Sequence, residues 1–283
     1  MGMWRVKTRA TDGRDTRFCH GMISVVRVFT NHQNNDPNMS MELTILFYVL
    51  LLIVAFLYAS VGHGGASGYL ALMALFNFAP EVMKPTALVL NLFVSLTAFI
   101  QYYRGGHFQW KVFLPLAVAS IPMAYLGGML TVDAHIYKRV LGVLLLAPIV
   151  RFLFFRNIPV EQLKPSRVVP SLAIGGSIGF LSGLIGIGGG ILLSPVLLLL
   201  KWTDQKQTAS ISALFIFVNS VAGLLGQMSK GIPFRPDMAG FTAVAFVGGL
   251  AGAWLGSKRF DSELLRILLA LVLMLAAWKL LFT

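Results

Sequence analysis

After residue 40 the chain alternates between long apolar runs and short polar or charged intervals. A helix that crosses a bilayer needs about 20 mainly apolar residues, because each residue advances it by only about 1.5 Å. The runs therefore predict a polytopic membrane protein of the all-α class. We expect ten helical segments, at residues 43–60, 66–79, 84–103, 110–130, 136–155, 168–185, 190–201, 206–228, 236–256 and 262–282.

The second and seventh segments are too short for ordinary spans, since a helix of about 14 residues covers only about 21 Å of a core about 30 Å thick. Each follows a glycine-rich stretch, where we expect a membrane helix to be interrupted. The stretches are Gly62, His63, Gly64 and Gly65, and Gly186, Ile187, Gly188, Gly189 and Gly190. Interrupted backbone at membrane depth survives only inside protein or beside a polar cavity, because lipid offers it no hydrogen bonds. The alternative is that the glycines only allow close helix packing.

The glycine-rich stretches belong to a longer internal similarity. At a separation of 124 residues the first stretch falls on the second, and Thr86 falls on Ser210. Further along, residues 101–108 resemble residues 227–234. We expect two homologous repeats, at 41–155 and 168–283, with an inter-repeat loop at 156–167. Five helices per repeat would invert the second repeat relative to the first, whereas re-entrant short segments would leave eight spans and parallel repeats.

Composition supports a membrane protein and narrows its partners. Of the 283 residues 57% are hydrophobic and 12% are charged, and the mean hydropathy is +0.77. The net charge of +12 comes from basic residues in the polar residues 1–40 and between the apolar runs, as expected of charges that flank a membrane. We expect no nucleic-acid partner, because no soluble stretch gathers these charges. Residues 1–40 are expected to be a disordered or spurious N-terminal extension.

No acidic residue is expected inside the membrane core. Every Asp and Glu beyond residue 40 falls at a segment end or in a loop. Cation carriers place carboxylates in the core to compensate a desolvated positive charge, so this pattern favours an anionic substrate. The sequence also offers no interior carboxylate pair, no His/Cys cluster and no nucleophile beside a base. We therefore expect no enzyme activity, no cofactor and no metal site.

The candidate substrate-binding groups are backbone amides and neutral side chains. Besides the two glycine-rich stretches, we assign to the site Thr86, Asn91, Ser210 and Asn219. Hydroxyls and amides can donate to an anion without holding it too tightly to leave, although they can equally form hydrogen bonds between helices. His63 is either a proton-linked switch or a cap on a carbonyl.

Two basic residues stand at corresponding span ends. Arg104 and Lys230 each follow a glutamine, Gln101 and Gln227 respectively. These four residues could form vestibules that attract anions. They could also anchor the spans at the membrane interface, and the sequence leaves both interpretations open.

Three duplicated motifs resemble the TauE/SafE sulfite exporter family over about residues 43–282. They are the Gly-x-Gly-Gly stretches, the pair Pro85-Thr86-Ala87-Leu88 and Ala209-Ser210-Ile211-Ser212, and the span end Tyr103-Arg104-Gly105-Gly106 with its partner. The resemblance implies a multi-pass permease of a prokaryotic inner membrane for small sulfur oxyanions such as sulfite, thiosulfate or organosulfonates. It also implies that the glycine-rich stretches flank the substrate and that Thr86 and Ser210 face it. The sequence departs from the family pattern at His63 and at Ala87-Leu88-Val89.

Our hypothesis is a secondary transporter that works by alternating access around a site between the repeats, near the midplane of the bilayer. Its partners would be a small anion and the lipid bilayer, with a coupling proton and a homodimer left open. Two alternatives remain. One is a membrane structural or assembly protein that uses the glycines only for packing, and the other is a carrier of non-sulfur anions such as small carboxylates.

Overall fold

The computed structural model describes residues 41–60, 65–154, 163–231, 237–256, 273–274 and 277–281. The chain divides into two units, Met1–Thr44 and Ile45–Thr283, and the contacts given below lie within the second. Residues 273–274 and 277–281 are helical. The longer helices are α2 (Met41–Ser60), α3 (Ala66–Leu75), α4 (Pro80–Arg104), α5 (Trp110–Met129), α6 (Ala134–Phe154), α7 (Val168–Ile185), α8 (Gly190–Leu199), α9 (Gln205–Met228) and α10 (Asp237–Gly256).

The predicted all-α class is confirmed for the residues that the structure describes, and each helix from α2 to α10 coincides with one predicted segment. The largest differences are that α3 ends at Leu75 instead of residue 79 and that α4 begins at Pro80 instead of residue 84. Proline suits the first helical turn because its missing N–H is not needed there, and Glu81 complements the helix dipole. The segment predicted at 262–282 lies largely outside the described residues.

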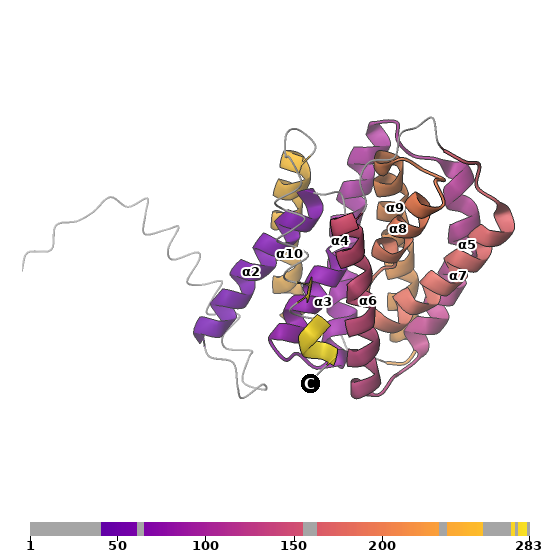
Figure 1. Cartoon of the computed structure of the whole chain (residues 1–283). Coiled ribbons are helices and arrows are strands. Elements are labelled where there is room, and N and C mark those ends of the chain that lie inside the picture. The colour runs from indigo at the N-terminus through magenta and orange to yellow at the C-terminus, as the bar shows by residue number, and fades with distance from the viewer. Residues whose placement is uncertain are drawn as a thin grey trace, which may run out of the picture. The chain divides into compact units, whose positions relative to one another are not determined.

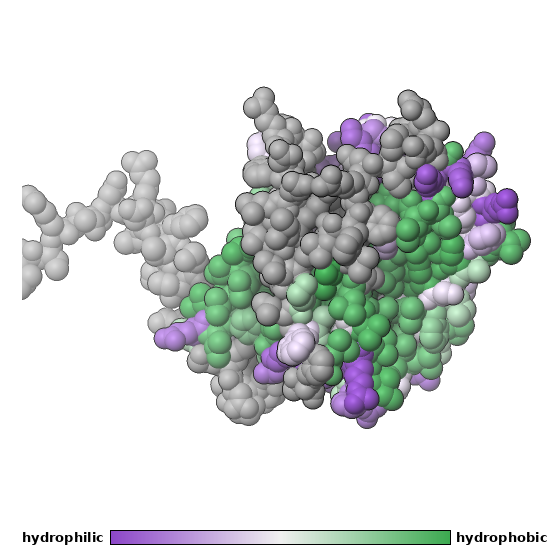
Figure 2. Space-filling view, in the orientation of Figure 1, coloured by the Kyte–Doolittle hydropathy of each residue, from purple (hydrophilic) through white to green (hydrophobic). Residues whose placement is uncertain are grey.

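The helices have the lengths and surface of a multi-pass membrane protein. Five of them, α2, α4, α5, α7 and α9, are long and apolar enough to cross a bilayer. Helices α3 and α8 have 10 residues each, so each covers only about 15 Å, as the two short segments predict. Figure 2 shows apolar residues over much of the described surface, with hydrophilic residues gathered toward its upper and lower edges. Such a surface is stable in contact with lipid tails.

Helices α3 and α8 also end in the same way. Asn77 has a φ of 60°, and the N–H of Phe78 donates to the carbonyl of Met73 over 3.0 Å. Lys201 and Trp202 repeat this arrangement at the end of α8, with a φ of 56° at Lys201. This is the Schellman motif, which satisfies the last carbonyls of a helix and turns the chain sharply. Both short helices therefore stop for the same local reason.

The closest helix packing joins α5 to α7. Helix α5 runs along α7 and also contacts α9, while α4 contacts both α9 and α10 (Figure 1). A Cβ atom on Gly175, Gly179 or Gly183 of α7 would overlap a backbone carbonyl oxygen of α5. Small residues at these positions let the two backbones approach and fix them against each other.

We expect Gly183→Ala to lower the free energy of unfolding by about 1–3 kcal/mol, because the new methyl group would overlap the carbonyl oxygen of Ala124. The measurement is the midpoint of thermal unfolding of the detergent-purified protein. Gly176→Ala is the matched control, since its Cβ would meet its nearest atoms at 3.7 and 3.8 Å and alanine favours a helix. Equal losses in the two variants would contradict the packing described here.

Candidate functional site

The second glycine-rich stretch separates helix α7 from helix α8. Helix α7 ends at Ile185 and α8 begins at Gly190. Three of the intervening residues, Gly186, Gly188 and Gly189, have φ values of 89°, 77° and 79°. Residues with a Cβ rarely adopt this left-handed region, so glycine is needed at each of the three positions. We call residues 186–190 the second break.

The first glycine-rich stretch is described only at its end. Gly62, His63 and Gly64 lie outside the described residues, so their predicted roles stay predictions. Gly65 is buried and precedes the first residue of α3. A Cβ on Gly65 would overlap the ring of Tyr69, so only glycine fits at position 65 beside this ring.

Carbonyl groups around the second break receive hydrogen bonds. The hydroxyl of Tyr137, from α6, donates to the carbonyl of Ile185 over 2.7 Å. The carbonyl of Gly189 accepts from the N–H groups of Leu192 and Leu193, as in an ordinary first helical turn. The carbonyl of Ile187 accepts a long bond of 3.5 Å from the side chain of Asn91.

The amide N–H groups of the same stretch have fewer partners than its carbonyls within the described part of the chain. The N–H of Gly186 donates to Ser182, but those of residues 187–191 have no acceptor among the described residues. All five residues are buried. Consecutive N–H groups without acceptors at the start of a helix, together with the positive end of its dipole, are the kind of donors that anions prefer.

Neutral polar side chains border these amides. Asn91, from α4, is fully buried, and its amide nitrogen lies 3.4 Å from the hydroxyl of Ser220 in α9. A Cβ on Gly188 would lie only 2.7 Å from that nitrogen, so Asn91 directly contacts the break. The carbonyl oxygen of Asn91 and the hydroxyl of Ser182 are buried and have no partner among the described residues. The predicted site residue Asn91 and the second break are therefore brought together.

A buried lysine also contacts the break, and the sequence interpretation missed it. Lys84 of α4 is 8% exposed and is the one charged residue among the buried side chains that the structure describes. Its ammonium donates to the carbonyls of Gly128 and Leu130, at the end of α5, over 3.3 Å each. A Cβ on Gly186 would lie 3.2 Å from its Cγ. The helix-start signal of Pro80 and Glu81 could have revealed that Lys84 lies one turn inside a helix.

The other predicted site side chains are buried, and two of them bond to their own helices. Thr86 donates to the carbonyl of Val82 over 2.6 Å, and Asn219 donates to that of Phe215 over 2.7 Å. The hydroxyl of Ser210 and the carbonyl oxygen of Asn219 are buried and have no partner among the described residues. Their assignment to the site stays a prediction.

The four predicted vestibule residues have different environments. Arg104 and Lys230 are exposed at the ends of α4 and α9, while Gln101 is half-buried. Gln227 is 2% exposed, and neither atom of its amide has a partner among the described residues. The two exposed cations suit either a vestibule or an interfacial anchor, so the structure leaves both interpretations open.

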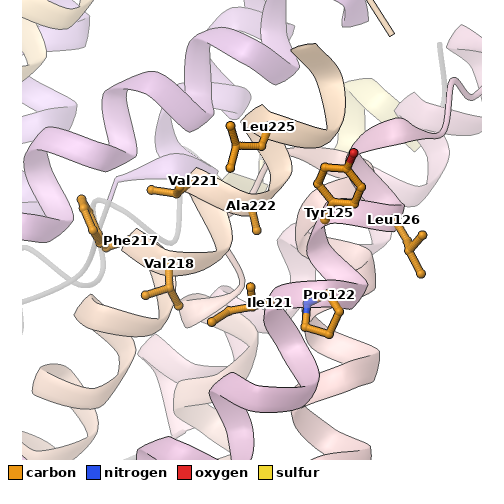
Figure 3. Close-up of a pocket in the computed structure, with 9 residues that line it drawn as sticks. All are labelled: Ile121, Pro122, Tyr125, Leu126, Phe217, Val218, Val221, Ala222 and Leu225. Carbon is orange, nitrogen blue, oxygen red and sulfur yellow. The ribbon is translucent and has the colours of Figure 1, made fainter. Parts of the chain in front are cut away.

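Two cavities in the described part of the chain lie away from the break. One is an apolar groove of about 650 Å³ between α5 and α9, and Figure 3 shows Ile121 and Pro122 on one side of it and Val218 and Val221 on the other. The other, of about 20 Å³, is lined in part by Lys138 and Lys279 near the end of α3. Neither is lined by residues 186–190, which instead pack against Asn91, Phe215 and Ile216.

A bundle of apolar helices that buries an interrupted helix with unpaired amides is the architecture of a membrane transporter. The chain belongs to the sulfite exporter TauE/SafE family, whose sequence profile matches residues 47–280. This confirms the resemblance carried by the duplicated motifs, and it places the protein among transporters and not among enzymes.

Individual relatives agree with this assignment. A probable membrane transporter protein of Sinorhizobium fredii is 35% identical over 238 residues, which cover 83% of this chain and 96% of the relative. A probable membrane transporter protein of Methanocaldococcus jannaschii is 28% identical over 198 residues, which cover 65% of this chain and 74% of the relative. A probable membrane transporter protein of Bacillus subtilis is 26% identical over 250 residues, which cover 81% of this chain and 96% of the relative. No solved structure matches the chain significantly.

We expect Gly188→Ala to destabilise the protein by about 3 kcal/mol, for two reasons. Alanine is unfavourable at the positive φ of this residue, and its methyl group would lie 2.7 Å from Asn91 and 2.8 Å from Ile216. Gly106→Ala is the control, since Gly106 has a φ of 72° but no atom within 4 Å of its Cβ position. That variant should lose only about 1–2 kcal/mol. Thermal unfolding midpoints in detergent measure both losses, and a smaller loss for Gly188→Ala would disprove the packed break.

Proposed function

We propose that this protein transports small sulfur-containing oxyanions, such as sulfite, thiosulfate or organosulfonates, and that the second break forms part of the substrate site. The observation that carries the proposal is the run of buried N–H groups at residues 187–191, which have no acceptor among the described residues, whereas the carbonyls of Ile187 and Gly189 receive hydrogen bonds. Because these N–H groups lack acceptors within the described part of the chain, the site favours a ligand that accepts hydrogen bonds. Oxyanions have several such acceptor oxygens.

The charge of the buried side chains supports the same class of substrate. Among the buried residues that the structure describes there is no carboxylate, so an anion would meet no like charge. Amides and hydroxyls are neutral donors, which bind an anion and still release it. The family name supports sulfite as one member of the substrate class.

We also propose that the chain consists of two inverted repeats, at 41–155 and 168–283. Two pairs of contacts support this proposal. The Schellman ends of α3 and α8 recur at a separation of 124 residues, with Phe78 and Trp202 in the same role. Gly127 approaches the carbonyl of Phe180, and Gly252 approaches that of Phe56, so α5 meets α7 as α10 meets α2.

In the alternating-access mechanism that we propose, the moving bodies are not the two halves of the sequence. Helix α5 belongs to the first repeat and α7 to the second, but glycines bring their backbones together. A close backbone interface has no long side chains that could rearrange, so the two helices would move as one body. The break meets α4 at two places, through the contact of Gly186 with Lys84 and through the long hydrogen bond of Asn91, which can be exchanged at little cost.

The proposal includes a location and leaves the coupling open. We place the protein in the inner membrane of a prokaryotic cell, supported by the bacterial and archaeal relatives. His63 remains a candidate for proton coupling. The predicted ligands Thr86, Ser210 and Asn219 are kept as candidates.

The test of the proposal is anion flux in liposomes that contain the purified full-length protein. We expect labelled thiosulfate to enter at least about tenfold faster than into empty vesicles, and sulfite and an organosulfonate to compete with it. If acetate alone competes, the protein is a carboxylate carrier. If no anion crosses and none raises the thermal unfolding midpoint, the structural or assembly function is favoured instead.

Asn91→Ala should reduce thiosulfate uptake by about tenfold, because it removes the one buried side-chain amide that contacts the described break. Uptake is measured at equal amounts of folded, reconstituted protein. Thr97→Ala is the matched control on the same helix, since its hydroxyl donates only to carbonyls of that helix. Equal uptake by the two variants would remove Asn91 from the site.

A further inference from the structure

We propose that Lys84 supplies the positive charge of the anion site at the second break. This inference rests on the proposed function and deepens it, because it names the group that would distinguish an anion from a neutral solute. Lys84 lies on α4, two turns before Asn91, and both residues contact the break. The break would then be bordered along α4 by a cation at one end and an amide at the other.

The pairing of Lys84 is incomplete. It is 8% exposed, and within the described part of the chain no carboxylate forms an ion pair with it. An ammonium has three donors, and among the described residues only two of them find acceptors, in bonds of 3.3 Å that are long for a charged donor. Neutral carbonyl groups compensate a buried charge only in part. A cation inside a helix bundle that is not paired with an acid marks the path of an anion.

The position of Lys84 suits this role. Its backbone and Cγ lie against Gly186, the first residue of the break, at 2.9 to 3.2 Å from where a Cβ would be. The ammonium stands on a flexible four-carbon chain, so it can turn without movement of α4. At the residue 124 positions later, the second repeat has Thr208, which bonds to Thr203 and Asp204. The cation is therefore a feature of one repeat only.

A structural role for Lys84 is the alternative. Cations near the C-terminus of a helix stabilise it, and Gly128 and Leu130 lie at the end of α5. Lys279 has that kind of role at α3, where its ammonium donates to the carbonyl of Leu75 over 2.7 Å. Lys279 does not line the second break, so it serves as a matched control for the loss of a helix-capping lysine.

Lys84→Gln separates the two roles, because glutamine can still donate to the carbonyls of α5 but carries no charge. In proteoliposomes we expect its KM for thiosulfate to rise by about tenfold or more, and in detergent we expect thiosulfate to no longer raise its unfolding midpoint. The unfolding midpoint without thiosulfate should stay close to that of the wild type. Lys84→Arg should keep the thiosulfate-induced shift and a KM within about threefold of the wild-type value. Lys279→Gln should keep the wild-type KM.

The outcomes distinguish this inference from the proposed function. If the wild-type protein transports thiosulfate and Lys84→Gln has the same KM as the wild type, the role of Lys84 is overturned and the proposed function stands. An equal rise in KM for Lys279→Gln would also overturn it, since capping would then explain the effect. Wild-type protein that neither binds nor carries a sulfur oxyanion would overturn both. If Lys84→Gln does not fold, loss of the thiosulfate-induced shift in folded Lys84→Arg decides against the inference.

Discussion

The structure depends on one constraint, which is that a backbone amide or carbonyl surrounded by lipid tails has no water to bond to. Regular helices meet this constraint internally, and that explains why the long apolar segments that the structure describes are helical. Residues 186–190 do not meet it, so the fold has to bury them. Tyr137 of α6 bonds to the carbonyl of Ile185, just before this stretch, and Asn91 of α4 bonds to that of Ile187 within it. The remaining N–H groups of the stretch are the donors on which the proposed anion site depends.

Much of the fold can be predicted from the sequence because it follows from local physical rules. Apolar runs of sufficient length define the spans, and glycines at 186, 188 and 189 indicate backbone that residues with a Cβ rarely adopt. The ends of α3 and α4 were less predictable. The αL turn at Asn77 uses a residue other than glycine, and Pro80 starts a helix in what reads as a polar interval.

The candidate site was harder to predict, because the direction of a side chain depends on tertiary packing. Asn91 and Thr86 look equally suitable in the sequence, and both are buried. The side chain of Asn91 bonds to Ile187 in the break between α7 and α8, whereas the hydroxyl of Thr86 bonds to a carbonyl of its own helix. Lys84 was overlooked because a lysine near the edge of an apolar run normally extends to the membrane surface. Its burial results from contacts with Gly186 and the end of α5, which are far away in the sequence.

The glycine contacts between α5 and α7 have a consequence for the origin of the molecule. If the chain consists of the two inverted repeats that we propose, and these arose from one ancestral gene, the ancestral polypeptide had to place its α5 equivalent against the α7 equivalent of another copy. The interface that is now internal was then a subunit interface, formed by two identical chains in opposite orientations. Gene fusion would have linked these chains without changing the contact of Gly127 with Phe180, or that of Gly252 with Phe56.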